Sequence, residues 1–359
     1  MPDNIWYPLA SSVIGSSHLK SGLPCQDASD SRVFADGRWA ALVVSDGHGS
    51  SKHFRSDRGA AFAVSCLMNM FESIWSPLDS DTPDRSGALE YFKRSAKAAV
   101  LASWGSAVAV DLVADPLNVD APDAGLKRHL VETLERGGAS AVAEEATRIV
   151  QIARLAGTVE ETQDYAKISN PYGATLLGIL IGPQDLLWFQ LGDGMLAQVA
   201  SGVVSHVVDS PAEAFANATP SLCSGDALRW ANTGHRMRVG GQPWPDFVVV
   251  ATDGVDNSYA NDDALFSFLT GLADGCRSAT PPSMEELLPR WLRQMSDDGS
   301  TDDASIALAY RADLNAQTMT TEQMIDQPER VIDVDEPSVH VTNDTVSRPS
   351  DLVIEDADD

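Results

Sequence analysis

Two aspartates in this sequence, Asp46 and Asp253, each end a run of consecutive apolar residues and are followed by glycine. An apolar run without alternation is typical of a strand buried on both faces, so each carboxylate is expected at the rim of a hydrophobic core. His48 stands two residues beyond Asp46, where its imidazole could donate or accept a proton. These residue types suggest a metal centre with a proton donor beside it. Strands that simply end in turns are the alternative that the residues leave open.

The electrostatics of converging carboxylates favour the metal interpretation. Two carboxylates about 4 Å apart repel one another by about 4 kcal/mol at an effective dielectric constant of about 20. A cluster of such groups is therefore expected only where a cation neutralises the charge. Ligands that are all oxygen select hard cations, here Mg²⁺ or Mn²⁺. The sequence predicts such a site if the ends of these strands converge.

The dipeptide Asp-Gly is also the favoured two-residue turn of a β-hairpin, and it occurs six times in the sequence. A turn explains Asp36 and Asp274 without any further role. For Asp193 a turn competes with a role in metal binding. A turn does not require the continuous apolar runs that precede Asp46 and Asp253.

Apolar periodicity predicts strands in hairpin runs, separated by long helical segments. A hairpin turning at Asp36-Gly37 is expected over 32–46, and a meander of four short strands over 173–208, with Asp193-Gly194 as one turn. Strands joined in this way form antiparallel sheets, so the predicted fold class is α+β. The other predicted elements are strands over 246–253 and 304–310, helices over 51–75, 88–104, 139–156, 262–273 and 284–296, and loops over 76–87 and 105–125.

Composition excludes several classes of protein. The 359 residues include 52 acidic and 25 basic ones, and the net charge of −27 argues against nucleic acid or an anionic membrane surface as a partner. The four cysteines are scattered and form neither a C-x-x-C pair nor a metal-finger pattern. We therefore expect them to be reduced thiols, as in the cytosol. The N-terminus lacks the pattern of a signal peptide, and the apolar run 175–182 is too short to span a membrane. We therefore expect a cytoplasmic monomer.

The composition changes after residue 311. Residues 312–359 contain 13 acidic residues, two arginines and no Phe, Trp or Tyr. Such a segment buries too little apolar surface to offset the entropy of ordering it. We predict a catalytic domain over 1–311 and a disordered acidic tail over 312–359.

Six motifs occur in a fixed order along the chain: CQDAS (25–29), VVSDGHGS (43–50), YGATLLG (172–178), FQLGDGMLA (189–197), VVVATDGVDN (248–257) and STDDASIAL (300–308). Together they resemble the metal-dependent type-2C protein Ser/Thr phosphatases, the PPM family. The match is closest to bacterial members, because the first motif reads CQDA rather than the commoner acidic pair. This resemblance implies an αββα sandwich of two antiparallel sheets flanked by helices.

The resemblance also implies a set of metal ligands for two Mn²⁺ or Mg²⁺ ions. Asp46 would bridge both ions, and the Gly47 carbonyl would complete the coordination of one of them. Asp253 and Asp302 would hold the inner ion, Asp302 being favoured over its neighbour because the family places this ligand three residues before a serine. Asp27 would act through waters near the second ion. Asp193, with the Thr175 backbone, would lie near a third ion.

The implied reaction is hydrolysis of phosphoserine and phosphothreonine by a hydroxide activated between two ions. His48 would protonate the leaving oxygen of the serine or threonine side chain. The implied partners are a phosphoprotein substrate and a cognate Ser/Thr kinase in phosphorylation signalling.

The sequence departs from the family pattern in two places. The arginine that commonly binds the substrate phosphate is replaced by Gly22, so His18 and Lys20 become candidates for that role. The interval before the third motif is long, which indicates an inserted excursion over 76–125.

Two other functions compete with this one. A phosphatase fold that serves only as a binding or regulatory module would be expected to have lost the central aspartates, and they are present. Cys223 and Arg229 match the C-x5-R pattern of cysteine phosphatases, but Asp226 would lie inside the loop that binds the phosphate anion. We reject that third possibility.

Overall fold

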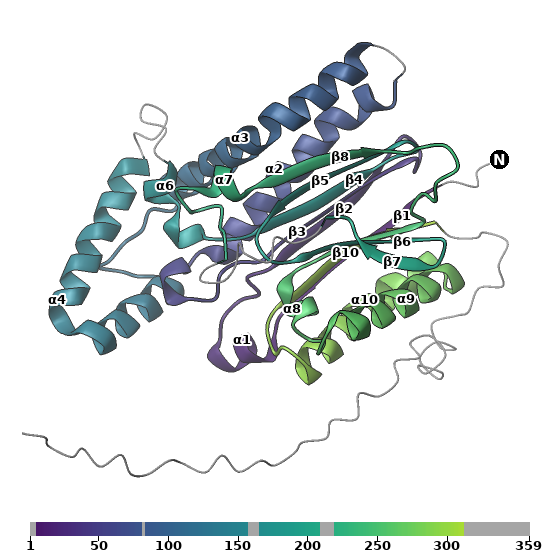
Figure 1. The fold of residues 1–359 in the computed structure, drawn as a ribbon. Helices are drawn as coiled ribbons and strands as arrows, with labels where there is room; N and C mark the ends of the chain where they lie inside the picture. Colours follow the sequence, from purple (N-terminus) through teal and green to yellow (C-terminus); the bar gives the residue numbers. More distant parts are fainter. Residues whose placement is uncertain (1–4, 81–82, 157–164, 209–218, 312–359) are drawn as a thin grey trace, which may run out of the picture.

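The computed structural model of the chain describes residues 5–80, 83–156, 165–208 and 219–311. Two five-stranded antiparallel sheets pack face to face, and helices cover the outer face of each (Figure 1). This arrangement confirms the predicted fold class. The predicted acidic tail, 312–359, lies outside the described residues. One sheet has the order β1 (Tyr7–Val13), β10 (Ala304–Tyr310), β9 (Phe247–Ala251), β6 (Met195–Ala200) and β7 (Val203–His206); the other has β2 (Ala28–Phe34), β3 (Trp39–Ser45), β4 (Leu176–Ile181), β5 (Asp185–Leu191) and β8 (Asn232–Met237).

The strand before Asp46 is apolar throughout because both of its faces are buried. Ala41 and Val43 on β3 belong to the core beneath the helices, whereas Leu42 and Val44 belong to the core between the two sheets. Successive side chains of a strand point to opposite faces, so two cores require apolar residues at every position. β9 is likewise buried along its whole length. The prediction of strands buried on both faces is confirmed.

Each sheet has its own helical layer. α2 (Ser56–Leu78) packs on β2, β3 and β4, and α3 (Pro83–Ala114) packs on α2 and β8. On the other sheet, α9 (Asp262–Ser278) contacts β7 and β10, and α10 (Pro281–Asp298) contacts β1 and β10. The remaining helical elements are α1 (Ser16–Ser21), η1 (Ser51–His53), α4 (Ala124–Ala156, kinked at Gly138), α6 (Tyr165–Ile168), η2 (Asn170–Tyr172), α7 (Ala227–Trp230) and α8 (Asp253–Asp256).

α3 is long and apolar enough, by length and composition alone, to cross a membrane. A helix packed in a protein core passes the same test, and α3 has such a buried side. Its Phe92 ring lies 6.4 Å from that of Phe71 on α2, and the Trp104 indole donates a hydrogen bond of 2.9 Å to the Gly59 carbonyl. This packing accounts for part of the apolar character of α3, while Val110 and Val113 of the same helix are exposed.

Several sequence predictions about local structure are wrong. The segment 173–208 is not a four-stranded meander, because β4 and β5 pair in one sheet while β6 and β7 pair in the other. Asp193 therefore lies in a link between sheets and not in a hairpin turn. The turn between β2 and β3 has four residues, 35–38, rather than two. Asp274 lies inside α9, where it forms no turn.

The long interval after α2 is also more regular than predicted. The segments 76–87 and 105–125, predicted as loops, are largely helical, since α2 extends to Leu78 and α3 runs from Pro83 to Ala114. β1 and β8 were not predicted at all. Both lie on sheet edges with mixed polar and apolar residues, so neither shows the continuous apolar run of a central strand.

Candidate metal centre

Five of the predicted ligands lie at strand ends on one edge of the sandwich. In antiparallel sheets the start of one strand lies beside the end of its neighbour. Asp27 directly precedes β2 and Asp46 directly follows β3, which is its partner. In the other sheet Asp253 follows β9 and Asp302 precedes β10. Asp193 lies where the chain crosses from one sheet to the other.

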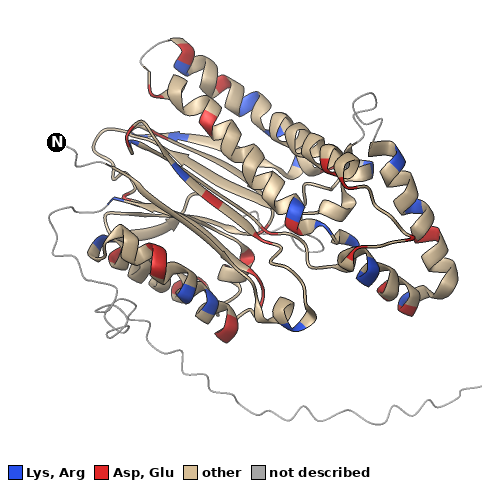
Figure 2. Ribbon diagram, turned by 180° about the vertical axis from the view of Figure 1, so that it is seen from behind, with Lys and Arg blue, Asp and Glu red and all other residues tan. Residues whose placement is uncertain are grey.

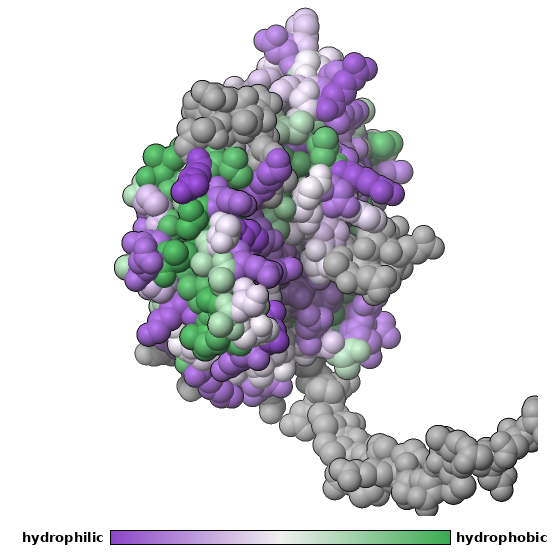
Figure 3. Space-filling model, turned by 90° about the vertical axis from the view of Figure 1, so that its left-hand side faces the viewer, coloured by the Kyte–Doolittle hydropathy of each residue, from purple (hydrophilic) through white to green (hydrophobic). Residues whose placement is uncertain are grey.

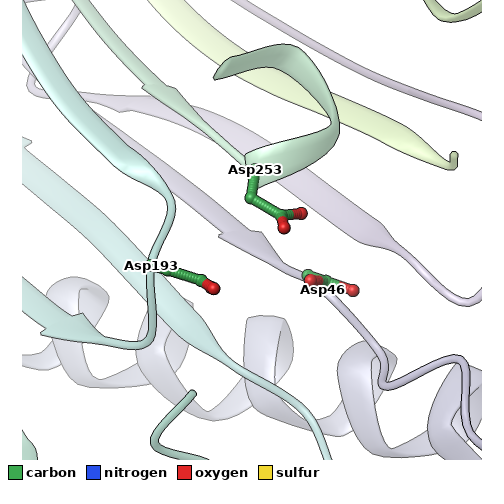
Figure 4. Close-up of side chains that lie close together, drawn as sticks. All are labelled: Asp46, Asp193 and Asp253. Atoms are coloured by element: carbon green, nitrogen blue, oxygen red, sulfur yellow. The ribbon is translucent and has the colours of Figure 1, made fainter. Parts of the chain in front are cut away.

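Asp46, Asp193 and Asp253 form the centre of this group. Each offers a carboxylate oxygen, and these oxygens lie within 4.8 Å of one another. Figure 4 shows the three side chains pointing toward a common space from three separate backbone segments. A donor set of carboxylate oxygens alone is suited to a hard divalent cation.

Burial makes these carboxylates costly to ionise without a cation. It raises the pKa of Asp46 well above its ordinary value, and the negative charge of Asp27 and of Asp253 adds to the effect. Burial followed by the charge of Asp193 raises the pKa of Asp253 to about 6. A divalent cation would offset both effects because its charge stabilises the ionised carboxylates, so the residues present fit one.

The glycines that follow the three aspartates allow backbone segments to approach closely. A Cβ on Gly254 would lie 1.9 Å from the Asp303 carbonyl oxygen, and one on Gly47 would lie 2.4 Å from the Gln26 carbonyl oxygen. A Cβ on Gly194 would lie 2.4 Å from the Ala251 carbonyl oxygen. Cβ atoms do not occur at such distances. The glycine of each Asp-Gly pair is therefore required where these backbone segments approach one another.

Hydroxyl groups hold the carboxylates and their backbone in place. The Asp46 amide donates to Thr175 Oγ1 at 2.9 Å, and the Thr175 amide donates to the Asp46 carbonyl at 2.8 Å. Thr219 Oγ1 donates to Asp193 Oδ2 at 2.6 Å. The sequence carried no signal for Thr219, because it meets Asp193 only through the fold.

Asp27 lies deeper than the three central aspartates. It accepts a hydrogen bond of 2.8 Å from Thr252 Oγ1, and it is buried. Burial, reinforced by the charges of Asp303 and Asp253, raises the pKa of Asp27 to about 8. Asp27 is therefore not one of the three carboxylates that converge, and its predicted action through water stays a prediction.

Asp302 and its neighbour Asp303 face different surroundings. The Asp303 side chain is buried and accepts hydrogen bonds from the amides of Gly15 (2.7 Å) and Gln26 (2.6 Å). The Asp302 side chain is 57% exposed, and its charge contributes to raising the pKa of Asp46 and of Asp253. Asp302 is not one of the three converging carboxylates, although its charge acts on two of them, whereas Asp303 joins backbone segments.

His48 lies beside the cluster in a second layer of polar residues. Its amide donates to the Gly173 carbonyl at 3.0 Å, and its ring lies 4.8 Å from that of His53. His53 Nδ1 lies 2.5 Å from the Asn170 carbonyl oxygen, to which it donates. Both rings line a pocket of about 510 Å³. The sequence analysis missed His53, which no motif distinguished.

The family model described as protein phosphatase 2C matches residues 14–293 of the chain. The chain belongs to the protein phosphatase 2C family. No curated protein has a sequence that matches it significantly.

Solved phosphatase structures resemble the chain at low sequence identity. They include Stp1 from Staphylococcus aureus (12% identity, TM-score 0.47, covering 85% of this chain and 95% of Stp1). PstP/Ppp from Mycobacterium tuberculosis is 13% identical, with a TM-score of 0.43, and the match covers 86% of this chain and 99% of that one. The catalytic domain of PstP has also been solved in complex with two manganese ions.

The position where the protein phosphatase 2C family commonly has a phosphate-binding arginine serves another purpose here. Gly22 ends α1 with a φ of 70°, a left-handed conformation that glycine adopts without strain. The two sequence candidates for the arginine's role lie elsewhere. His18 Nδ1 lies 2.9 Å from Asp303 Oδ2, and Lys20 is exposed on α1. Neither lines the pocket beside His48.

Proposed function

We propose that this member of the protein phosphatase 2C family is a metal-dependent phosphatase of phosphoserine and phosphothreonine in proteins. The observation that carries the proposal is the convergence of Asp46, Asp193 and Asp253 within 4.8 Å beside a polar pocket. A structural ion-pair network would place basic side chains among these carboxylates. No ion pair involves any of the three within the part of the chain that the structure describes.

The carboxylates would hold divalent cations, Mn²⁺ or Mg²⁺. Asp46 and Asp253 come from different sheets, so cations bound here would join the two layers of the sandwich. The chemistry that such ions supply is Lewis-acid activation of water and neutralisation of phosphate charge. The protein contributes the rigid strand ends that keep these oxygens in place, because β3 and β9, the strands that precede Asp46 and Asp253, are buried along their whole length.

His48 would donate a proton to the oxygen that leaves the phosphorus. That oxygen departs from a serine or threonine side chain as a strongly basic alkoxide, which needs a proton at neutral pH. Burial lowers the pKa of His48, although the charge of Asp193 opposes the effect. A lower pKa reduces the protonated fraction but makes the proton a better acid.

The first test combines activity with metal binding. We expect turnover of a phosphoserine peptide with Mn²⁺, loss of turnover in excess EDTA, and a rise in melting temperature on addition of Mn²⁺, since a ligand that binds the folded state stabilises it. Asp253→Asn should lose both the turnover and the rise. Asp297→Asn, an exposed aspartate at the end of α10, is the control and should keep both.

Full turnover in EDTA would refute the proposal. A protein that gains stability from Mn²⁺ but hydrolyses no phosphopeptide would instead be a binding module with a phosphatase fold.

A further inference from the structure

The pocket beside the carboxylate cluster has a positively charged residue in its lining and no carboxylate among its described lining residues. It lies against the cluster, because Thr219 lines it and donates to Asp193. None of its described lining residues is Asp or Glu, and Lys52 brings a full positive charge. A pocket with this lining contrasts with the net charge of −27 of the whole chain.

Lys52 is available for a ligand. Its side chain is exposed, and no described residue forms an ion pair with it. Lys52 is among the residues that line the pocket. Burial lowers the pKa of His53 to about 4, and the charges of His48 and of Lys52 contribute to the lowering. His53 is therefore uncharged at neutral pH, so Lys52 and not His53 supplies positive charge to the pocket.

Uncharged hydrogen-bond donors accompany the lysine. The side chains of Ser50, Asn170 and Ser224 line the pocket, and none of them is hydrogen-bonded to another residue in the described ranges. Hydroxyl and amide groups together with one ammonium can satisfy the oxygens of a carboxylate or a phosphate. The lining is thus suited to an anion.

The phosphate that reacts belongs elsewhere, over the three carboxylates that would bind the metal. Asp46 and Asp253 do not line the pocket, whereas His48 lies on the boundary between the two places. A peptide whose phosphoserine occupied the cluster would place a neighbouring residue in the pocket.

We propose that this pocket recognises an anionic side chain that flanks the phosphorylated residue, with Lys52 as the residue that determines this specificity. The inference rests on the proposed phosphatase function and adds the substrate class: phosphoproteins with an acidic or second phosphorylated residue near the reacting phosphoserine or phosphothreonine. The chemistry shared by the two sources is a group of anionic oxygens.

The test uses the full-length protein with Mn²⁺ and a set of phosphoserine peptides of one parent sequence. A single Asp, phosphoserine, Ala or Lys is moved through the positions on either side of the reacting residue. At one or more positions kcat/KM should be about three- to fivefold higher with an anion than with lysine, the size expected for a partly exposed charge pair. Asp and phosphoserine arms distinguish a carboxylate from a second phosphate as the preferred group.

Variants of Lys52 then assign the preference to this residue. Lys52→Met should reduce the ratio between anionic and basic peptides to near one, and Lys52→Glu should invert it. Lys93→Glu, which changes an exposed lysine on α3 away from the pocket, should keep the wild-type ratio. Added salt should weaken the preference in the wild type, because exposed charges are screened.

p-Nitrophenyl phosphate, which has no flanking residue, separates the two proposals. Its metal-dependent turnover should stay close to that of the wild type in Lys93→Glu, and in the Lys52 variants it gives the reference rate against which losses on the peptides are compared. Absence of that turnover in the wild type would refute the phosphatase function itself. A wild-type enzyme that turns over p-nitrophenyl phosphate but shows no preference among the peptides would overturn the inference alone. Equal losses on all substrates in Lys52→Met would also overturn it, since Lys52 would then bind the reacting phosphate.

Discussion

At the scale of single residues, the candidate site contains two kinds of side chain. Some lie at the carboxylate cluster, and others form hydrogen bonds that hold the backbone in place. Asp302 and Asp303 are adjacent, yet one is 57% exposed at the rim of the cluster and the other is buried among amides. His48 and His53 are close, yet only His48 is two residues from a central aspartate. Residue type alone does not distinguish the members of either pair.

His48→Ala should affect substrates according to how much their leaving group needs a proton. A serine alkoxide needs one, whereas nitrophenolate is already stable near neutral pH. Turnover of a phosphoserine peptide should therefore fall by about 10²–10⁴-fold, and that of p-nitrophenyl phosphate clearly less. Both are measured at saturating Mn²⁺, so that a change in metal affinity has no effect. Equal losses on the two substrates would contradict the acid role.

Asp302→Ala and Asp303→Ala should differ in their effects on turnover and on stability. Asp302→Ala should lower metal-dependent turnover while the free energy of unfolding changes little, because its side chain is largely exposed. Asp303→Ala leaves two buried amides and the ring of His18 without their partner, which should cost about 2–4 kcal/mol of stability. Urea unfolding and turnover per folded molecule measure the two effects. Similar turnover losses with unchanged stability in both variants would show that the register of this segment is misassigned.

At the scale of elements, the helices α3 and α4 support the segments that line the pocket. Ser51 in η1 lies 3.3 Å from His129 Nδ1 on α4, and the other ring nitrogen of His129 lies 2.6 Å from Glu145 Oε1. Arg55 is buried and donates to the Tyr172 hydroxyl at 2.9 Å and to the Asp115 carbonyl at 2.8 Å. The helical excursion is therefore attached to η1, which contains His53, and to Tyr172 of η2.

Glu145→Gln should weaken the contact between the two arms of α4, which meet at the kink at Gly138, in a pH-dependent way. Hydrogen bonds from Arg148 and then from His129 lower the pKa of Glu145 from 4.5 to about 2. The carboxylate therefore stabilises the folded state above about pH 4.5, and this contribution is lost as the pH falls toward 2. At neutral pH the variant should unfold about 1–2 kcal/mol more easily, and the difference should shrink below about pH 4.

The exposed neighbour Glu144 offers a matched control. Glu144→Gln should unfold like the wild type throughout this pH range in the same urea titrations. A Glu145→Gln variant as stable as the wild type at neutral pH would show that this ion pair contributes nothing to stability.

At the scale of the whole molecule, charge lies mainly on the helical layers. Figure 2 shows acidic and basic residues interspersed along the outer helices and few on the strands. On the side of the molecule where α4 lies, apolar side chains gather in a broad area (Figure 3). Exposed Val131 and Leu134 on α4 contribute to the apolar surface of the molecule. The catalytic machinery proposed here lies at one edge of the strands, apart from both features.

Deleting residues 312–359 should leave the folded domain and its metal-dependent turnover of p-nitrophenyl phosphate largely intact. The segment has 13 acidic residues and no Phe, Trp or Tyr, so it contributes little that a core requires. Melting temperature and turnover of the truncated protein are compared with those of the full chain. A much lower melting temperature or an insoluble product would show that the segment packs against the domain.

The sequence by itself determined the parts that depend on local pattern. The apolar runs before Asp46 and Asp253 predicted strands with two buried faces, and the structure shows a core on each side of β3. Hairpin runs separated by helices predicted the α+β class. These predictions succeed because side-chain periodicity reports directly which faces of a strand are buried.

Only the tertiary structure decided the matters that depend on contacts between distant segments. The turn propensity of Asp193-Gly194 predicted a hairpin, but packing of two sheets draws the chain across from β5 to β6 and brings Asp193 to Asp46 and Asp253. The environments of Asp302 and Asp303, and the position of Lys52 beside the pocket, likewise depend on which segments meet there. Residues far apart in the sequence acquire a common environment only when the core between the sheets closes, because no local interaction holds them together before that.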